Sequence, residues 1–346
     1  MPRSTEVPAA GPLPVREDWL ARHSEPALHP EWPLVDAHHH LWAREGWPYG
    51  AQDLLADIGQ GHQVLATVFV QCRSFYFDTG PAEMRPVGET VHAAAVAAQS
   101  DATGSGPRLC AGIVGYADLT LGASVRGVLE AHADAGQGRF RGIRHSTAWD
   151  ADPVIANPEL GSAARMLEAQ AFRAGFAQLQ PLGLSYDAWI YHPQIAELTA
   201  LARAYPDTTI VLNHLGGPIG LDRFAGRHHE VYDDWRRSIS ALAACDNVYL
   251  KLGGLAMRIG GRQFHQADRP LSSHALAEAF QPWFEVALEA FGPMRCMFES
   301  NFPVEKASCG YTVLWNAFKR FCQPLSTDER EALLRGTASR VYRLAL

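Results

Sequence analysis

The sequence predicts an α/β protein, a closed (β/α)8 barrel of the TIM type, and three observations lead to that prediction. Eight short runs rich in Val, Ile and Leu recur along the chain, most of them continuous, as expected of strands buried on both faces. Stretches rich in Ala, Leu and Glu separate most of these runs, and such alternation predicts parallel strands with right-handed crossovers. No G-x-G-x-x-G or G-x-x-x-x-G-K motif follows a strand, so the usual markers of the alternative, an open doubly wound sheet, are missing.

The predicted elements follow one another behind an N-terminal arm. The arm, residues 1–33, has two Pro-rich stretches around a helical candidate at 16–23, and we expect it to be partly extended and laid on the barrel, which spans 34–346. Strands are predicted at 34–40, 64–72, 109–116, 140–146, 182–191, 208–215, 247–255 and 295–302. Helices are predicted at 88–99, 122–135, 193–204, 232–244 and 275–291, and a long loop near 256–274 is placed to cover the barrel mouth.

Composition narrows the function classes before any motif is considered. The 346 residues are 47% hydrophobic with a net charge of −7, which supplies a large core but no basic stripe for nucleic acid or an anionic membrane. The six cysteines are scattered without a C-x-x-C pair, as in a reduced protein. No signal peptide and no apolar run of ~18 residues is visible. We expect a cytoplasmic protein that acts on a small molecule, with a homo-oligomer left open.

Histidines end two of the predicted strands on the face where barrel enzymes carry out chemistry. The first strand ends in His38 and His40, which point the same way because side chains alternate along a strand. The sixth ends in His214, followed by glycines that allow close approach of backbone and ligand. Three imidazoles at one site would bind a divalent ion, zinc or manganese, or clamp a substrate oxygen. Structural histidines bonded to loop groups are the alternative.

Charged residues in three further strands extend this set toward a substrate. Arg144 and His145 end the fourth strand, and an arginine inside a barrel needs a carboxylate partner on the protein or the substrate. Lys251 stands alone in an apolar seventh strand, while Asp187 lies in the fifth strand and His192 just beyond it. We expect these residues to bind substrate, with structural ion pairs or caps as the alternative.

The eighth predicted strand offers a carboxylate for proton transfer. Glu299 and Asn301 share a strand face and should point into the barrel. A carboxylate there would activate water if it lies within hydrogen-bond reach of it. The alternative is a buried glutamate paired with a strand arginine or with Lys251.

Four segments together resemble the amidohydrolase-related hydrolases. They are 35–42 (VDAHHHLW), 141–145 (RGIRH), 211–218 (VLNHLGGP) and 298–304 (FESNFPV), in the family's order on strands one, four, six and eight. The resemblance extends from about residue 27 to the end of the chain, and it points to the branch that contains L-fuconolactonase and 2-pyrone-4,6-dicarboxylate lactonase. It implies a (β/α)8 barrel that hydrolyses a cyclic ester or related carbonyl compound at its C-terminal mouth, in a branch with metal-dependent and metal-independent members.

One position departs from the family pattern. The family's strand-eight motif usually reads Gly-Ser-Asp-(Trp/Phe)-Pro, and its aspartate transfers the proton. This chain has Asn301 there, and a neutral amide is no base. Glu299 replaces the small residue two positions earlier, one pleat repeat, roughly 7 Å, deeper in the barrel. We hypothesise that Glu299 has taken over as base while Asn301 orients substrate or water, and the lost anionic ligand weakens the prediction of a bound metal.

The expected function is therefore hydrolysis of a lactone or related cyclic ester by activated water. One alternative keeps the fold but changes the reaction to metal-dependent, non-oxidative decarboxylation of an aromatic acid. Another is a barrel that binds a metabolite without turning it over, because the usual aspartate is lost. The carboxylate gained at Glu299 speaks against this last alternative.

Overall fold

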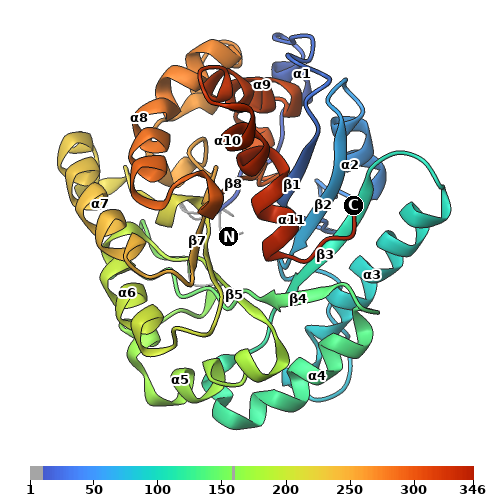
Figure 1. Ribbon diagram of the computed structural model, residues 1–346, viewed down its shortest axis with the longest axis vertical. Coiled ribbons are helices and arrows are strands. Elements are labelled where there is room, and N and C mark those ends of the chain that lie inside the picture. The colour runs from blue at the N-terminus through green and yellow to red at the C-terminus, as the bar shows by residue number, and fades with distance from the viewer. Residues whose placement is uncertain (1–10, 158–159) are drawn as a thin grey trace, which may run out of the picture.

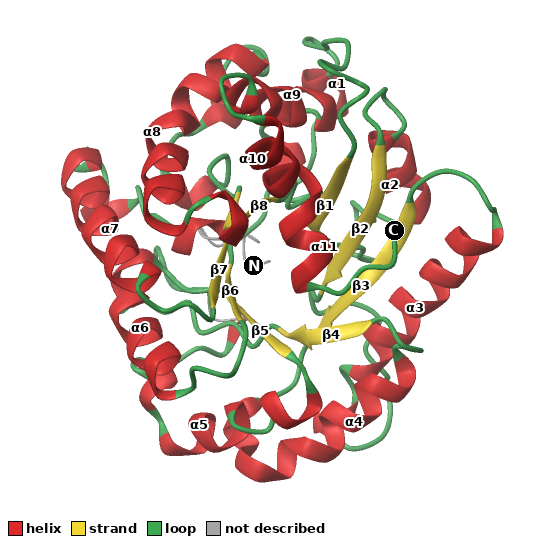
Figure 2. Ribbon diagram, viewed as in Figure 1, coloured by secondary structure: helices red, strands yellow, loops and turns green. Residues whose placement is uncertain are grey.

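Eight parallel strands form the centre of the computed structural model, which describes residues 11–157 and 160–346 (Figures 1 and 2). Each strand pairs with the next along the chain, in the order β1 to β8, and this confirms the predicted (β/α)8 fold class. The strands are β1 (Leu34–His39), β2 (Val64–Val70), β3 (Arg108–Gly115), β4 (Phe140–Ile143), β5 (Ser185–Ala188), β6 (Ile210–Leu212), β7 (Val248–Leu252) and β8 (Cys296–Phe298).

Helices cover the outside of the barrel, as Figure 2 shows. The helices of the described residues are α1 (Glu17–Leu20), α2 (Ala51–Ile58), α3 (Val87–Ala102), α4 (Arg126–Ala135), α5 (Gln170–Phe176), α6 (Ile195–Ala204), α7 (His228–Ala243), α8 (Ser273–Phe291), α9 (Tyr311–Cys322), α10 (Thr327–Glu331) and α11 (Thr337–Val341), and α11 lies across one end of the barrel. In α7 the buried residues Val231, Trp235, Ile239 and Leu242 recur every three or four positions, which places one apolar stripe against the strands. None of the described helices combines the length and apolar character that a membrane span requires.

The barrel closes between β1 and β8 just beyond the end of β8. The backbone N–H of Asn301 donates to the carbonyl of His38 at 2.8 Å, and that of His40 donates to the carbonyl of Phe302 at 2.8 Å. Behind this seam the buried carboxylate of Asp36 accepts hydrogen bonds from Ser300 and from the Tyr311 hydroxyl. The seam therefore fixes the first-strand histidines beside the residues that follow β8.

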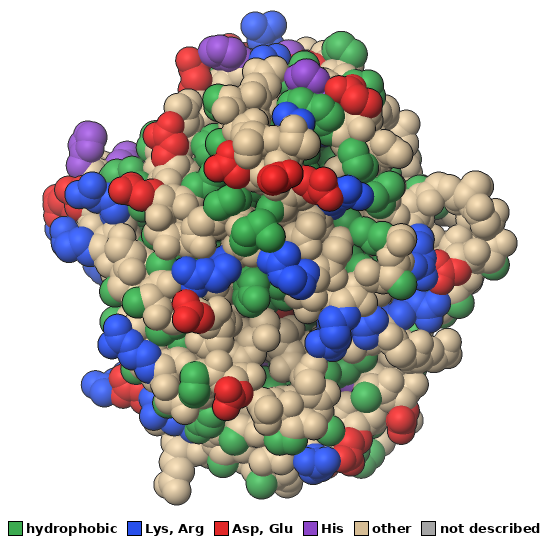
Figure 3. All heavy atoms as spheres, viewed as in Figure 1, with side chains coloured by type: hydrophobic (Ala, Val, Ile, Leu, Met, Phe, Trp, Pro, Cys, Tyr) green, Lys and Arg blue, Asp and Glu red, His purple; other side chains and the backbone are tan. Residues whose placement is uncertain are grey.

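The other end of the barrel is filled by apolar side chains and by the last helix. Tyr342, directly after α11, packs against side chains from several strands, and its hydroxyl donates to Asp187 Oδ2 at 2.8 Å. The strand residues in this layer include Val35, Val68, Val211 and Met297. The face that α11 covers carries acidic and basic side chains interspersed with apolar ones (Figure 3). Among the described residues, the open end of the barrel is therefore its C-terminal end, which is where barrel enzymes have their active sites.

Several strands are shorter than the sequence predicts. The fifth predicted strand, 182–191, is reduced to Ser185–Ala188, and the eighth, 295–302, to Cys296–Phe298. The chain leaves extended geometry where polar residues begin, with positive φ at His214 and Asn301, 54° and 53° respectively. Such a φ is unusual for a non-glycine residue and is common at functional sites.

The described part of the arm lies against the long loop between β7 and α8. The Trp19 indole N–H donates to the Ala267 carbonyl at 2.8 Å, and Arg22 donates to the Asp268 carbonyl at 3.1 Å. Glu25 accepts from the backbone N–H of Ser273 at the start of α8. Residues 1–10, the first part of the predicted arm, lie outside the described residues.

The same loop is held from below by a buried glutamate. Glu305, which follows β8, is 1% exposed and accepts a hydrogen bond from the backbone N–H of Ala256 at 3.1 Å. Burial raises the pKa of Glu305 to about 8, and the nearby Glu299 adds to the shift. The carboxyl is therefore largely protonated at neutral pH.

We expect Glu305→Gln to change how stability depends on pH. The folded-state pKa is raised above that of the unfolded chain, so the wild type loses stability as pH rises from about 4.5 toward 8, by at most about 1.4 kcal/mol per pH unit. Gln does not ionise, so the variant lacks this loss. The free energy of unfolding of the variant minus that of the wild type should therefore be larger at pH 8 than at pH 5. Urea unfolding of both proteins at the two pH values measures this, and a difference that does not vary with pH contradicts it.

Candidate active site

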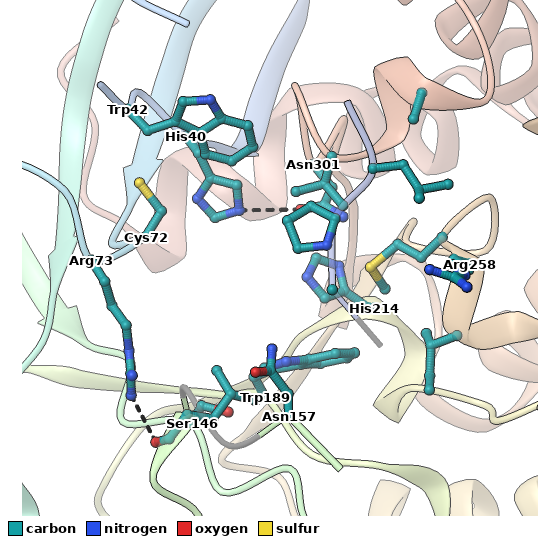
Figure 4. A pocket seen from close by; sticks show the side chains of 18 of the residues that line it. His40, Trp42, Cys72, Arg73, Ser146, Asn157, Trp189, His214, Arg258 and Asn301 are labelled. Atoms are coloured by element: carbon teal, nitrogen blue, oxygen red, sulfur yellow. Dashed lines mark hydrogen bonds between the residues drawn. The ribbon is translucent and has the colours of Figure 1, made fainter. Parts of the chain in front are cut away.

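A cavity of about 130 Å³ opens at the C-terminal end of the barrel. His40, His214 and Asn301, which follow the ends of β1, β6 and β8, project into it, and Trp189 lies across from His40 (Figure 4). Arg144 also contributes to its wall. The predicted site residues from strands one, four, six and eight thus meet at one place.

The first-strand histidines lie against each other as the strand alternation predicts. His38 Nε2 and His40 Nε2 are 3.3 Å apart. His40 Nδ1 donates to the Val70 carbonyl at 2.7 Å, so its Nε2 is an acceptor. This Nε2 lies 3.3 Å from Asn301 Oδ1, and two acceptors do not bond. The amide therefore hydrogen-bonds to His40 in the flipped orientation, with its otherwise unpartnered Nδ2 toward the ring.

Glu299 lies behind the histidines and reaches the cavity only through them. Its Oε1 accepts from His214 twice, from the backbone N–H at 2.9 Å and from Nδ1 at 2.7 Å. Its Oε2 lies 2.8 Å from His38 Nδ1. The carboxylate is fully buried and is not among the residues that line the cavity. Because Nδ1 of His214 carries the donated proton, its Nε2 is left as an acceptor.

Two glycines after β7 make room for this pair. Gly254 has φ +74°, and a Cβ there would lie 2.4 Å from His214 Cβ. A Cβ on Gly253 would lie 2.4 Å from Glu299 Cγ. Both distances are far below van der Waals contact, so only glycine allows this loop to support His214 and Glu299.

Two cations flank His38. Lys251 Nζ lies 3.3 Å from His38 Nδ1 and forms a buried ion pair with Asp187 at 2.8 Å. Arg144 Nη1 lies 3.2 Å from His38 Nε2, and its second amino group donates to the Gln71 carbonyl. Asp187 and Lys251 therefore lie beneath the histidines, while Arg144 reaches the cavity itself.

Burial and these cations keep the imidazoles neutral. Burial lowers the pKa of His38 well below its usual value, and Lys251 lowers it further. Burial also lowers the pKa of His40, with Arg144 contributing. The pKa of His214 is lowered by burial as well, although Glu299 opposes the shift. Neutral imidazoles are the form that accepts a proton from water.

The spacing of three residues would allow a metal ion. His38, His214 and Glu299 each offer a ligand atom, and these atoms lie within 4.8 Å of one another. The hydrogen bonds and charges oppose such an ion, however. Glu299 Oε1 already binds two N–H groups of His214, and Arg144 occupies the Nε2 side of His38. Arg144 and Lys251 place two positive charges beside His38, and these would repel a divalent ion there. The three residues have the spacing of a metal site, and the second carboxylate oxygen of Glu299 has no hydrogen-bond partner among the described residues, but the two cations beside His38 work against a bound ion.

Four residues expected to bind substrate do not line the cavity: Asp187 and Lys251, which form the buried ion pair beneath the histidines, and His145 and His192. His145 Nδ1 accepts from the backbone N–H of Leu119 at 3.1 Å, and its ring packs between Tyr116 and Phe172. His192 Nδ1 faces the backbone N–H of Ile219 at 3.3 Å. Both hold loops in place, which is the structural alternative for a histidine near a strand end.

Other lining residues carried no sequence signal strong enough to single them out. Gln71, after β2, donates to the Arg144 carbonyl at 3.1 Å, and Trp189, after β5, packs edge-on against His214 with ring centroids 4.9 Å apart. Arg44, Arg73 and Arg258 come from loops after β1, β2 and β7. Their position at strand ends was the available signal, but loop conformation decides whether such a side chain turns toward the mouth.

We expect Gly254→Ala to displace His214 and to reduce turnover by at least about 100-fold, because a methyl group would clash with the ring and the φ is unfavourable for alanine. Gly127→Ala is the matched control, since Gly127 lies in α4 and a Cβ added there would have no heavy atom within 4 Å. Alanine there should leave turnover unchanged and stabilise the helix by up to about 1 kcal/mol. Equal turnover of the Gly254 variant and the control, measured by steady-state kinetics, would show that His214 does not need a glycine at position 254.

Comparison with known proteins places the chain in a family. The amidohydrolase family model matches residues 35–344. An uncharacterised protein of Sinorhizobium fredii, y4mH, is 32% identical over 90% of this chain and 98% of its own length. The L-fucono-1,5-lactonase of Burkholderia multivorans is 31% identical over 68% of this chain and 72% of its length. A crystal structure of a Burkholderia multivorans amidohydrolase with bound zinc has a TM-score of 0.71 at 24% identity, covering 91% of this chain and all of that one.

The family match spans the whole barrel and includes every residue of the histidine and glutamate cluster. The expected resemblance is thereby confirmed: the chain belongs to the amidohydrolase family and is a hydrolase.

Proposed function

We propose that this hydrolase opens a lactone or a related cyclic ester with water activated at the barrel mouth. The observation that carries the proposal is the buried Glu299–His214 pair, with the ring of His214 on the wall of the cavity. A carboxylate that holds an imidazole in one tautomer is the arrangement by which hydrolases turn histidine into a general base. Relatives named L-fucono-1,5-lactonase and L-rhamnono-gamma-lactonase support a cyclic ester as the substrate class.

In this mechanism His214 is the catalytic base and Glu299 acts through it. His214 Nε2 takes a proton from water, and the water oxygen attacks the lactone carbonyl carbon. Glu299 keeps Nδ1 protonated and stabilises the imidazolium that forms. This assignment keeps the expected role of Glu299 in proton transfer but moves the contact with water to His214, because Glu299 does not line the cavity.

The remaining lining residues stabilise the charge that develops on the carbonyl oxygen. Arg144 lines the cavity, and its guanidinium would donate to an oxyanion that forms there. His40 and Asn301, hydrogen-bonded to each other, also line the cavity and would orient water or substrate. When the ring C–O bond breaks, the leaving oxygen takes the proton from His214, and the product is a hydroxy acid.

We expect Glu299→Gln to lower kcat by up to about 10,000-fold, the loss seen when the carboxylate of a hydrolase triad is made neutral. Because Glu299 does not touch substrate, KM should change little. Glu305→Gln is the control, since Glu305 is a buried glutamate nearby that does not touch His214. Steady-state kinetics on a panel of lactones, with unfolding midpoints for all three proteins, gives the readout. Unchanged turnover in a folded Glu299→Gln protein would contradict the proposal that Glu299 makes His214 a general base.

We also expect the protein to work without a metal ion. Protein purified without chelator should carry well below one equivalent of zinc or manganese and should keep its activity after dialysis against EDTA, because the positive charges of Arg144 and Lys251 beside His38 repel a divalent cation. Stoichiometric metal, with activity lost on chelation and restored by zinc or manganese, contradicts this. That outcome, with turnover of aromatic acids and not of lactones, would instead favour metal-dependent decarboxylation.

A further inference from the structure

We propose that the N-terminal arm completes the wall of the catalytic cavity and that its residue Leu13 limits the size of the substrate; this proposal rests on the hydrolysis proposed above. Three consecutive residues of the arm, Gly11, Pro12 and Leu13, line the same cavity as His214. The family match begins only at residue 35. This part of the wall, called the arm tip below, therefore comes from outside the matched barrel.

The arm is fixed to the barrel behind its tip. Trp19 is 3% exposed, and its indole N–H donates to a carbonyl of the loop between β7 and α8. Further along the arm, Asn316 of α9 donates to the Pro26 carbonyl at 2.9 Å. The buried Lys319, also on α9, donates to the Trp32 carbonyl at 3.1 Å. These bonds hold the arm beside the loop whose first residues line the cavity, and the tip extends from there to the cavity wall.

The arm tip itself is not fastened in this way. Within the described part of the chain, no hydrogen bond joins residues 11–13 to another segment. Leu13 is half-buried, and it does not pack against any of the apolar clusters that the described residues form. A leucine that lines a cavity without packing into a core adds little to stability, but its carbon atoms occupy space that a ligand would otherwise fill. Leu13 therefore acts on what the cavity accepts.

The cavity is small with the arm tip in place. Its volume is about 130 Å³, against roughly 300–1,000 Å³ for pockets that hold drug-sized ligands. Such a space suits a single ring with small substituents. In a closely packed apolar site, a difference of one methylene group changes selectivity by about 10-fold or more. Removing the branched end of Leu13 should therefore change which lactones are accepted.

Hydrolysis of two lactones that share the same ring tests this proposal. They are δ-valerolactone and δ-decalactone, which carries an additional pentyl chain. We expect Leu13→Ala to raise the ratio of kcat/KM for δ-decalactone to kcat/KM for δ-valerolactone by at least about 10-fold, because the smaller side chain leaves room for the pentyl chain. Leu13→Trp should lower this ratio for the opposite reason. Leu121→Ala is the matched control, since Leu121 is 38% exposed and lies outside the cavity, and it should leave the ratio unchanged.

Binding of cyclic ketones, which water cannot open, separates this proposal from the proposed function. Cyclohexanone and its pentyl-substituted counterpart are titrated by calorimetry into the wild type, Leu13→Ala and Leu121→Ala. We expect the affinity for the pentyl compound, relative to cyclohexanone, to rise at least about 10-fold in Leu13→Ala alone. A ratio that Leu13→Ala leaves unchanged, in hydrolysis or in binding, overturns the role of Leu13 and leaves lactone hydrolysis in place. The expected change in binding, in a protein that hydrolyses no lactone, would support the arm as a cavity wall but contradict the proposed function.

Discussion

The hydrogen bond between the carboxylate of Glu299 and Nδ1 of His214, 2.7 Å long, is the interaction on which the site depends. A fully buried carboxylate costs several kcal/mol in lost hydration unless hydrogen bonds and charges compensate it. Here the compensation comes from both N–H groups of His214, from the nearby His38 ring and from the cations around it. The same contacts fix the tautomer of His214 and turn its free nitrogen into an acceptor. The same hydrogen bonds therefore stabilise the buried charge of Glu299 and leave His214 ready to accept a proton.

Charge balance explains how so many ionisable groups share the barrel interior. Lys251 is paired with Asp187, whose Oδ2 also accepts from Tyr342 and Asn213. Arg144 and Glu299 lie on other sides of His38, and the buried Asp36 accepts from its backbone N–H. Attraction between these opposite charges offsets part of the cost of burying them. Arg144 is the member of this set that lines the cavity.

The fold, and the clustering of His38, His40, His214 and Glu299 in space, were predictable from the sequence because both follow from simple periodicities. Continuous apolar runs identified all eight strands, and strand alternation placed His38 and His40 on one face. The position of Glu299 on the same strand face as Asn301 also pointed to the barrel interior. The sequence did not predict which side chains of the loops face the cavity. His145 and His192 follow strand ends but turn away from it, toward the backbone of Leu119 and Ile219. Arg73 and Arg258, which were not singled out, line it. Positive φ at His214 and Asn301 is set by tertiary contacts, so no local pattern indicates it.

The proposed mechanism requires His214 to be a neutral base whose tautomer is fixed by Glu299. Nitrogen-15 NMR of the protein labelled in its histidine rings measures this directly, with His214 assigned by its loss in a His214→Asn variant. We expect a neutral ring at pH 7 with the proton on Nδ1 and a bare Nε2, and a change in these signals in Glu299→Gln. A ring protonated on Nε2, or on both nitrogens, at that pH would contradict the mechanism.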